Sequence, residues 1–347
     1  NTSLGPDAGF AGVERAGLAA ALEHYKARRA VIVGSALMHY SLEKAADLLG
    51  IGTEGFVRVP VDPDSRVRLD DVRAAMKACK ERGDRVIAVV GIAGTTDSGA
   101  IDPLPELAAI AREAKTHLHV DAAWGGPLLF SPEQRSKLAG IELADSVTID
   151  GHKQLYLPMG IGMVLLRDPT IARAIEKQAQ YIIRADSPDL GRRALEGSRP
   201  GMALYLHAAL HVIGASGYAW LVEEGIRKAR WMAARLRERD EFELLAEPQM
   251  NIVNYRYLPV DLRSKARALT LSPDEQIVIN QTNERLQEKQ RAVGQTFVSR
   301  TTLRFTRHGH DLPIAALRAV LANPLTEESH IEAMLEGQVD VGDGLVR

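Results

Sequence analysis

Short apolar runs alternate with amphipathic stretches along the first two-thirds of the chain. The apolar runs, such as AVIVG and VIAVV, predict strands at residues 30–34, 56–59, 86–90, 117–121, 146–149 and 162–166. The stretches between them have the apolar spacing of helices at residues 41–49, 69–82 and 103–115. This alternation predicts a mostly parallel sheet with helices on both faces. In such sheets, ligands bind at the carboxyl ends of the strands.

The pattern changes after residue 200. A long helical stretch at residues 202–239 is broken near its glycines at 214–217. It is followed by predicted strands at 241–246, 252–257, 295–299 and 302–306, and by predicted helices at 273–292, 313–321 and 327–336. Helices mixed with short strands indicate a smaller α+β domain. We therefore predict a large domain over residues 1–200 and a small C-terminal domain over residues 201–347.

Composition and charge restrict the partners of the chain. The 347 residues carry a formal net charge of −2, which provides neither a basic surface for nucleic acid nor a strong field toward a membrane. No apolar run reaches the roughly 18 residues needed to span a bilayer. Cys79 is the single cysteine, so an intramolecular disulfide is excluded. We expect a cytoplasmic protein without nucleic-acid or membrane partners.

Two charged residues follow neighbouring predicted strands. The segment HLHVDAAWGG places Asp121 at a strand end, and DSVTIDGHKQLYLPMGIG places His152 and Lys153 just after the next strand. Pyridoxal phosphate (PLP) needs an amine to form an imine with its aldehyde, and an acid to keep its pyridine nitrogen protonated. Each residue also has an ordinary interpretation: Lys153 as a surface cation, and Asp121 as a helix cap or turn residue.

Two further features stand at predicted strand ends, and each admits two interpretations. His39, in LMHYSLEKAA, either belongs to the capping region of the next helix or stacks its flat ring on a flat cofactor. Thr95 and Thr96 are either turn residues or hydrogen-bond donors to a ring substituent. Four such features in this order are much rarer by chance than any one of them, so we predict a PLP site.

Four segments resemble the group II PLP-dependent amino-acid decarboxylases: HYSLEKAADLLGIG, GIAGTTDSGAIDP, HVDAAWGGP and DSVTIDGHKQLYLPMG. The resemblance covers essentially the whole chain. It implies the fold-type I architecture, an α/β fold with a mostly parallel seven-stranded-type sheet, helices on both faces and a smaller C-terminal α+β domain. The segments GHKQLYLPMG, QYIIRADSPDLGRRALEGSRPGMA and FVSRTTLRF look closest to the bacterial aspartate 1-decarboxylase branch, with tyrosine decarboxylases more distant.

The resemblance implies cofactor roles for the residues that match the family's motifs. Lys153 matches the lysine that forms the imine, and His152 stands directly beside it. Asp121 matches the aspartate that pairs with the pyridine nitrogen and raises the pKa of that nitrogen. His39 matches a histidine that stacks on the ring, and Thr96 matches a threonine near the cofactor.

Three other positions carry weaker implications. Asp150 lies where many relatives have an asparagine near the cofactor, and an acid there disfavours a phosphate unless other groups compensate. Arg318, in ALRAVLANP, matches an arginine that glutamate decarboxylases use for a substrate carboxylate, and its other interpretation is a charge on a helix surface. Tyr181 is the tyrosine nearest to the predicted loop at 184–200, where several relatives have a tyrosine that returns a proton; His39 is the alternative acid.

The implied activity is α-decarboxylation of a small acidic L-amino acid, with aspartate to β-alanine favoured and glutamate to γ-aminobutyrate next. An aromatic substrate such as tyrosine comes third, and an aminotransferase or carbon–carbon lyase is the alternative in the same fold. The family's phosphate loop normally precedes the His39 motif, and nothing in residues 1–38 fits it. The alternative from another class is therefore an inactive, proteolysed fragment without its N-terminal portion. The family also implies a homodimer with active sites between subunits.

Overall fold

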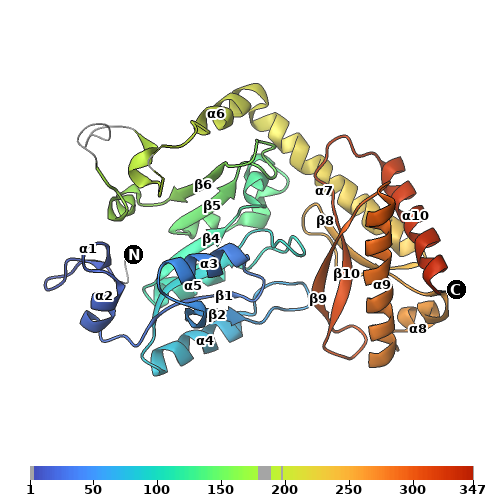
Figure 1. Cartoon of the computed structure of the whole chain (residues 1–347), viewed down its shortest axis with the longest axis horizontal. Helices are drawn as coiled ribbons and strands as arrows, with labels where there is room; N and C mark the ends of the chain where they lie inside the picture. The colour runs from blue at the N-terminus through green and yellow to red at the C-terminus, as the bar shows by residue number, and fades with distance from the viewer. Residues whose placement is uncertain (1–3, 179–188, 197, 347) are drawn as a thin grey trace.

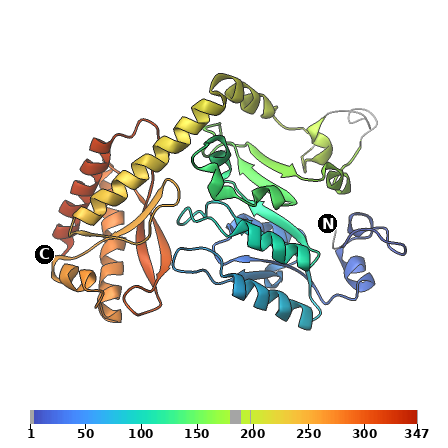
Figure 2. The same cartoon turned by 180° about the vertical axis from the view of Figure 1, so that it is seen from behind.

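A computed structural model describes residues 4–178, 189–196 and 198–346 of the chain. These residues form a four-stranded sheet and a larger sheet of six strands, rather than the seven-stranded type that the resemblance implies. The two sheets lie in separate lobes, and the long helix α7 (Gly214–Glu238) runs from one lobe into the other (Figure 1). Figure 2 shows the same arrangement from behind. The α/β fold with a smaller α+β domain agrees with the sequence analysis, whereas the division at residue 200 stays a prediction.

The larger sheet is parallel except for its last strand. Its order is β2-β1-β3-β4-β5-β6, and β6 runs antiparallel to β5. The strands are β1 (Ala30–Ser35), β2 (Phe56–Val59), β3 (Arg85–Ile92), β4 (His117–Asp121), β5 (Ser146–Asp150) and β6 (Gly162–Leu166). Each begins within one residue of its predicted start, because buried parallel strands give nearly continuous apolar runs that the sequence displays directly.

Alternate side chains of β1 pack against different helices. Val31 and Val33 lie in the main core with residues of α4 (Leu69–Glu81) and α5 (Leu104–Glu113). Ile32, between them, packs with apolar side chains of α2 (Leu18–His24) and α3 (Tyr40–Leu48). Since successive side chains of a strand point to opposite faces, helices cover both faces of this sheet. The short helix α1 (Val13–Ala16) adds to the α2 side.

The smaller sheet is antiparallel, with the order β7-β8-β10-β9. Its strands are β7 (Phe242–Leu244), β8 (Ile252–Tyr257), β9 (Ser299–Phe305) and β10 (Leu312–Val320). Helices α7, α9 (Pro273–Val293) and α10 (Glu328–Val346) close its apolar core, and α8 (Arg263–Arg267) adds Ala266 to a neighbouring cluster. A capping box starts α9, because the Ser272 and Glu275 side chains each accept the other's backbone N–H.

The predicted break in the helical stretch after residue 200 is present, slightly earlier than expected. Helix α6 (Ala203–Val212) ends before Ile213, and α7 begins at Gly214. No residue of α6 is buried, although the helix is strongly apolar. Its Leu204 and Val212 side chains are 70% and 84% exposed. Within the described residues, no helix is both long enough and apolar enough to cross a membrane.

The helix predicted at residues 313–321 is wrong, because this segment forms strand β10. The sequence PIAALRAVL is rich in Ala and Leu, which favour helices. β10 instead pairs with both β8 and β9, and residues 314–317 are buried. Pairing on both sides and burial override a weak local preference. The two strands predicted at 295–299 and 302–306 are likewise corrected to the single strand β9.

Candidate active site

A cavity of about 430 Å³ lies at the carboxyl ends of β1, β3, β4 and β5. Its volume is in the range of small-molecule sites. The ends of these strands, the loops that follow them and the start of α3 supply the lining, as the parallel-sheet rule predicts. The lining includes six residues that the sequence analysis singles out: His39, Thr96, Asp121, Asp150, His152 and Lys153.

Lys153 follows β5 by three residues, and its amine forms an ion pair inside the cavity. Lys153 Nζ is 2.9 Å from Asp150 Oδ2, and the two side chains are 25% and 20% exposed. His152 Nε2 is 3.9 Å from the same oxygen, while its Nδ1 lies 3.3 Å from the Ile161 carbonyl oxygen. Asp150 therefore provides an ionic partner for Lys153, a role that the sequence did not indicate.

Asp121 ends β4, and polar contacts continue along the neighbouring strands. Its Oδ1 accepts a hydrogen bond from the Ala123 backbone N–H at 3.1 Å. Two residues earlier on the same face, His119 Nδ1 is 2.8 Å from Ser146 Oγ, and His119 Nε2 is 3.3 Å from Thr148 Oγ1. Burial lowers the pKa of His119, and the Asp121 carboxylate opposes that shift. A histidine thus lines the cavity beside the carboxylate.

His39 caps helix α3 and also lines the cavity. Its Nδ1 accepts a hydrogen bond from the Ser41 backbone N–H at 3.4 Å and lies 2.8 Å from Ser41 Oγ. These contacts occupy Nδ1 and leave Nε2 for other partners. Of the two threonines, Thr96 lines the cavity, whereas Thr95 is buried and its Oγ1 accepts from the Ala100 backbone N–H at 3.1 Å. Thr95 is therefore the turn residue of the pair.

Arg318 lies on β10, outside the cavity lining. Its interpretation as a helix-surface charge is wrong, because the residue is on a strand and is largely covered. Nη1 donates to Ser299 Oγ at 3.1 Å, and the buried Nε has no hydrogen-bond partner among the described residues. Burial lowers the pKa of Arg318, and the carboxylate of Asp97, the residue after Thr96, opposes the shift. Arg318 thus lies near the Thr96 loop.

Some cavity residues were not singled out from the sequence. His119 carries a recognisable signal, because it stands two residues before Asp121 and therefore on the same face of β4. Trp124 and Thr148 also line the cavity, and nothing in the sequence distinguishes them from core residues. Tyr181 lies outside the described residues. The roles that the resemblance implies for the individual residues stay predictions.

The cavity residues fit the ring end of PLP. An amine for the aldehyde and a carboxylate for the pyridine nitrogen line the same cavity. Asp121 Oδ1 has its backbone donor, whereas Oδ2 has no donor among the described residues and suits a protonated ring nitrogen. Residues 4–38 contain no loop rich in Ser, Thr and Gly that would present backbone N–H groups to a phosphate. The described residues therefore fit PLP through the groups that face its ring, namely Lys153 and Asp121.

The chain matches known proteins over most of its length. Residues 15–258 match the family model described as the pyridoxal-dependent decarboxylase conserved domain. An aspartate 1-decarboxylase from Aliivibrio fischeri is 44% identical over 346 residues, which are 98% of this chain and 62% of that protein. An L-2,4-diaminobutyrate decarboxylase from Rhizobium meliloti is 35% identical over 251 residues, which are 71% of this chain and 50% of that protein.

The fold is also similar to solved structures. Mouse CSAD in its apo form superposes with a TM-score of 0.84 and 27% identity, over 95% of this chain and 66% of that chain. The chain thus spans between half and two-thirds of the length of these relatives. The matches confirm the predicted fold-type I architecture and the PLP cofactor.

Proposed function

This chain belongs to the pyridoxal-dependent decarboxylase family, and we propose that the protein is a carboxy-lyase that removes the α-carboxylate of a small acidic L-amino acid. The observation that carries the proposal is the pairing of Lys153 and Asp121 in one cavity at the carboxyl ends of β4 and β5. The lysine amine and the carboxylate are the two groups that the reactive ring of PLP requires.

Each cavity residue has a defined task in this proposal. We assign Lys153 to the cofactor aldehyde, and Asp121 to the pyridine nitrogen, where a carboxylate favours the protonated ring. When bound, PLP supplies an electron sink. It accepts the electron pair of the bond between the α-carbon and the carboxylate when the carboxylate leaves as carbon dioxide. Asp150 holds Lys153 Nζ at 2.9 Å and so orients the amine that later releases the product. His152 flanks this ion pair, and Thr96 lines the same cavity, where its hydroxyl could donate to the cofactor.

We propose that His39 or Tyr181 donates the proton that returns to the α-carbon. Ser41 engages His39 Nδ1, so Nε2 is the nitrogen that carries the proton in the first case. An imidazole N–H is an effective proton donor and suits this task. Comparison of His39→Gln with Tyr181→Phe separates the two residues. Substitution of the true donor lowers kcat with little change in KM, because the proton transfer occurs only after the substrate has bound.

L-Aspartate is the favoured substrate and L-glutamate the next. The 44% identity to an aspartate 1-decarboxylase supports this order. A dicarboxylic substrate also needs a cation beyond the ring, and Arg318 provides one near the Thr96 loop. Its unpartnered Nε and its planar fork suit a second carboxylate. The similarity to an L-2,4-diaminobutyrate decarboxylase adds a basic amino acid as a further candidate substrate.

Carbon dioxide release from a panel of amino acids tests the proposal. The panel contains L-aspartate, L-glutamate, L-2,4-diaminobutyrate, L-tyrosine and L-cysteine sulfinate, each with the full-length protein and added PLP. We expect β-alanine and carbon dioxide from L-aspartate at the highest kcat/KM. A keto-acid or aldehyde product without carbon dioxide would indicate an aminotransferase or carbon–carbon lyase instead. Absence of both turnover and PLP binding in the 347-residue chain alone, with turnover by the full-length protein, would support the inactive fragment.

We also propose that the protein works as a homodimer in the cytoplasm. Exposed apolar side chains gather on α6 and β6, including Leu204, Val212, Val164 and Leu165. Exposed apolar surfaces of this kind mark protein interfaces. The single cysteine is buried and free, which suits a reducing compartment. Light scattering is expected to give twice the monomer mass, and a monomer at micromolar concentration would contradict the dimer.

A further inference from the structure

A closed ring of three hydrogen bonds joins the loops that carry Asp121 and Lys153. Gln154 Nε2 donates to the Trp124 carbonyl oxygen at 2.7 Å, and Trp124 Nε1 donates to Asn251 Oδ1 at 2.9 Å. Asn251 Nδ2 completes the ring by donating to Gln154 Oε1 at 3.3 Å. The carbonyl can only accept and the indole N–H can only donate, so both amide orientations are fixed by chemistry.

This ring is buried and lies where the two lobes meet. Gln154 is 2% exposed and Asn251 is 1% exposed. Asn251 directly precedes β8 of the small domain, whereas Gln154 directly follows Lys153. A buried amide that loses its hydrogen-bond partner destabilises the fold by its full desolvation free energy. Breaking any one of the three hydrogen bonds is therefore unfavourable. The ring therefore fixes the Lys153 loop against the small domain.

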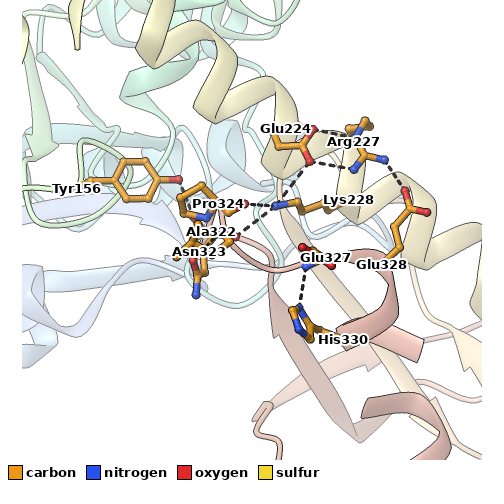
Figure 3. A network of polar contacts seen from close by, with 11 residues as sticks. Tyr156, Glu224, Arg227, Lys228, Ala322, Asn323, Pro324, Glu327, Glu328 and His330 are labelled. Carbon is orange, nitrogen blue, oxygen red and sulfur yellow. Dashed lines mark hydrogen bonds and ion pairs between the residues drawn. The ribbon is translucent and has the colours of Figure 1, made fainter. Parts of the chain in front are cut away.

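A second anchor connects the same loop to the segment after β10 (Figure 3). The Tyr156 hydroxyl donates to the Ala322 carbonyl oxygen at 2.7 Å. Lys228 Nζ, from α7, donates to the next two carbonyls, those of Asn323 at 3.4 Å and Pro324 at 2.9 Å. Lys228 is only 2% exposed. Three successive carbonyls are thus held from the Lys153 loop and from α7, which makes this segment a firm attachment point.

The backbone is strained at Tyr156 itself, the residue of the second anchor. Tyr156 has a φ of 56°, a left-handed conformation that costs a residue other than glycine about 1 kcal/mol. Its N–H donates to the Lys153 carbonyl oxygen at 3.0 Å, which closes the turn. The buried Tyr218 of α7 donates its hydroxyl to the Leu155 carbonyl oxygen at 3.0 Å. Three consecutive residues after Lys153 are therefore held by α7 or the small domain.

We propose that Gln154, Trp124 and Tyr156 are positioning residues, which couple the placement of the small domain to the geometry of Lys153 and Asp121. The proposal rests on the proposed function, because it takes Lys153 and Asp121 as the cofactor residues. The two anchor points lie close together, since Leu321, the residue before Ala322, donates its N–H to the Asn251 carbonyl oxygen at 2.8 Å. A displacement of the small domain would therefore move both anchors, and with them the lysine loop.

Two substitutions test this coupling in the full-length protein with added PLP. Tyr156→Phe removes one hydroxyl, and Gln154→Met removes the amide at nearly constant volume. Tyr255→Phe is the matched control: Tyr255 is fully buried in the small domain, and its hydroxyl donates to Gln338 Oε1 at 2.9 Å away from the loop. For each protein, the measurements are the Kd for PLP, the pH dependence of the visible absorbance of bound PLP, and the melting temperature without cofactor.

We expect the Kd for PLP to rise about tenfold in Tyr156→Phe and Gln154→Met, a change similar to the net value of one hydrogen bond. The midpoint of the absorbance titration is expected to shift in both. Tyr255→Phe should lower the melting temperature and leave both cofactor measurements unchanged. If the loop variants behave like this control, the residues are merely structural and the proposal is overturned. Shifted cofactor measurements in a protein that decarboxylates no amino acid would support the positioning role while contradicting the proposed function.

Discussion

At the scale of single residues, Lys153 is the most decisive group in the cavity. It is the one lysine in the described lining, so no neighbouring amine there replaces it. Lys153→Ala is therefore expected to abolish both the visible absorbance of bound PLP and carbon dioxide release. Lys137→Ala is the control, because that partly buried lysine donates to the Gln249 carbonyl oxygen away from the cavity. Retained visible absorbance in the Lys153 variant would contradict the assignment.

Arg318 gives a prediction about substrate choice. A charge-assisted pair of hydrogen bonds contributes about 1.5–3 kcal/mol, so Arg318→Ala is expected to raise the KM for L-aspartate roughly ten- to a hundredfold. The KM for the monocarboxylic L-2-aminobutyrate should change far less. Arg304→Ala is the control, because this exposed arginine pairs with Asp311 on the surface of the small domain. Equal effects on both substrates would remove Arg318 from the specificity role.

The residues that were predictable from the sequence share one property. Asp121 is the last residue of β4 and Lys153 closely follows β5, and the geometry of a parallel sheet brings such positions to one edge without further information. Asn251 and Arg318 lack this property. They lie in the other lobe, and their positions depend on the path of α7 between the lobes and on the strand pairing of the smaller sheet. Local sequence predicts neither that path nor that pairing, so the hydrogen bonds between Gln154 and Asn251 could not be predicted.

At the scale of elements, the same distinction separates correct from wrong predictions. β1 to β6 were found because their apolar runs are as short as strands and are bounded by polar residues. β10 was mistaken for a helix because it lies between two partner strands, where even an Ala- and Leu-rich segment is buried and extended. The periodicity of apolar residues indicates which side chains are buried. In a strand that is buried on both faces, nearly every residue is apolar, and the pattern no longer distinguishes a strand from a helix.

Helix α7 makes a close contact that depends on a glycine. A Cβ at Gly225 would lie 2.9 Å from the Leu321 carbonyl oxygen and 3.2 Å from Asn251 Nδ2. Gly225→Ala is therefore expected to destabilise the protein by about 1–3 kcal/mol, because the helix must move away from a backbone atom. This range is the net effect, after the gain in helix propensity of about 1 kcal/mol that alanine brings.

Gly337→Ala in α10 is the matched control for that substitution. Its Cβ would meet no atom within 4 Å, so only the propensity term applies. The melting temperature should fall in the Gly225 variant and rise in the Gly337 variant. A rise in both variants would show that the close approach of α7 to Leu321 does not limit the packing.

At the scale of the whole molecule, the second lobe contacts the loops that line the cavity. Asn254 Nδ2 donates to the Asp97 carbonyl oxygen at 3.1 Å, beside Thr96. Trp124 and Tyr156 make the corresponding contacts for the loops after β4 and β5. The loops after three neighbouring strands are therefore each tied to the small domain. The cavity residues come from the large sheet, but their relative positions are maintained by both lobes.

Stability of the whole fold should also depend on pH through one buried acid. Asp102 is 3% exposed and accepts hydrogen bonds from the backbone N–H groups of Val67 at 2.7 Å and Ile92 at 2.9 Å. These bonds join the end of β3 to the turn before α4. Burial nevertheless outweighs them and raises the pKa of Asp102 from 3.8 to about 6.

The raised pKa determines the sign of the effect. Between about pH 4 and pH 6 the folded protein binds the Asp102 proton and the unfolded chain does not, so the free energy of unfolding falls as pH rises through this window. At about 1.4 kcal/mol per pH unit, wild-type protein should lose about 2 kcal/mol relative to Asp102→Ala between pH 4.5 and pH 7. Melting temperatures of both proteins across this range measure the difference. Asp47→Ala, at an exposed position, should show no such trend. A gap between wild type and Asp102→Ala that stays constant with pH would mean that the two backbone donors balance the burial of Asp102, and a gap that widens would mean that they outweigh it; either result would contradict the raised pKa.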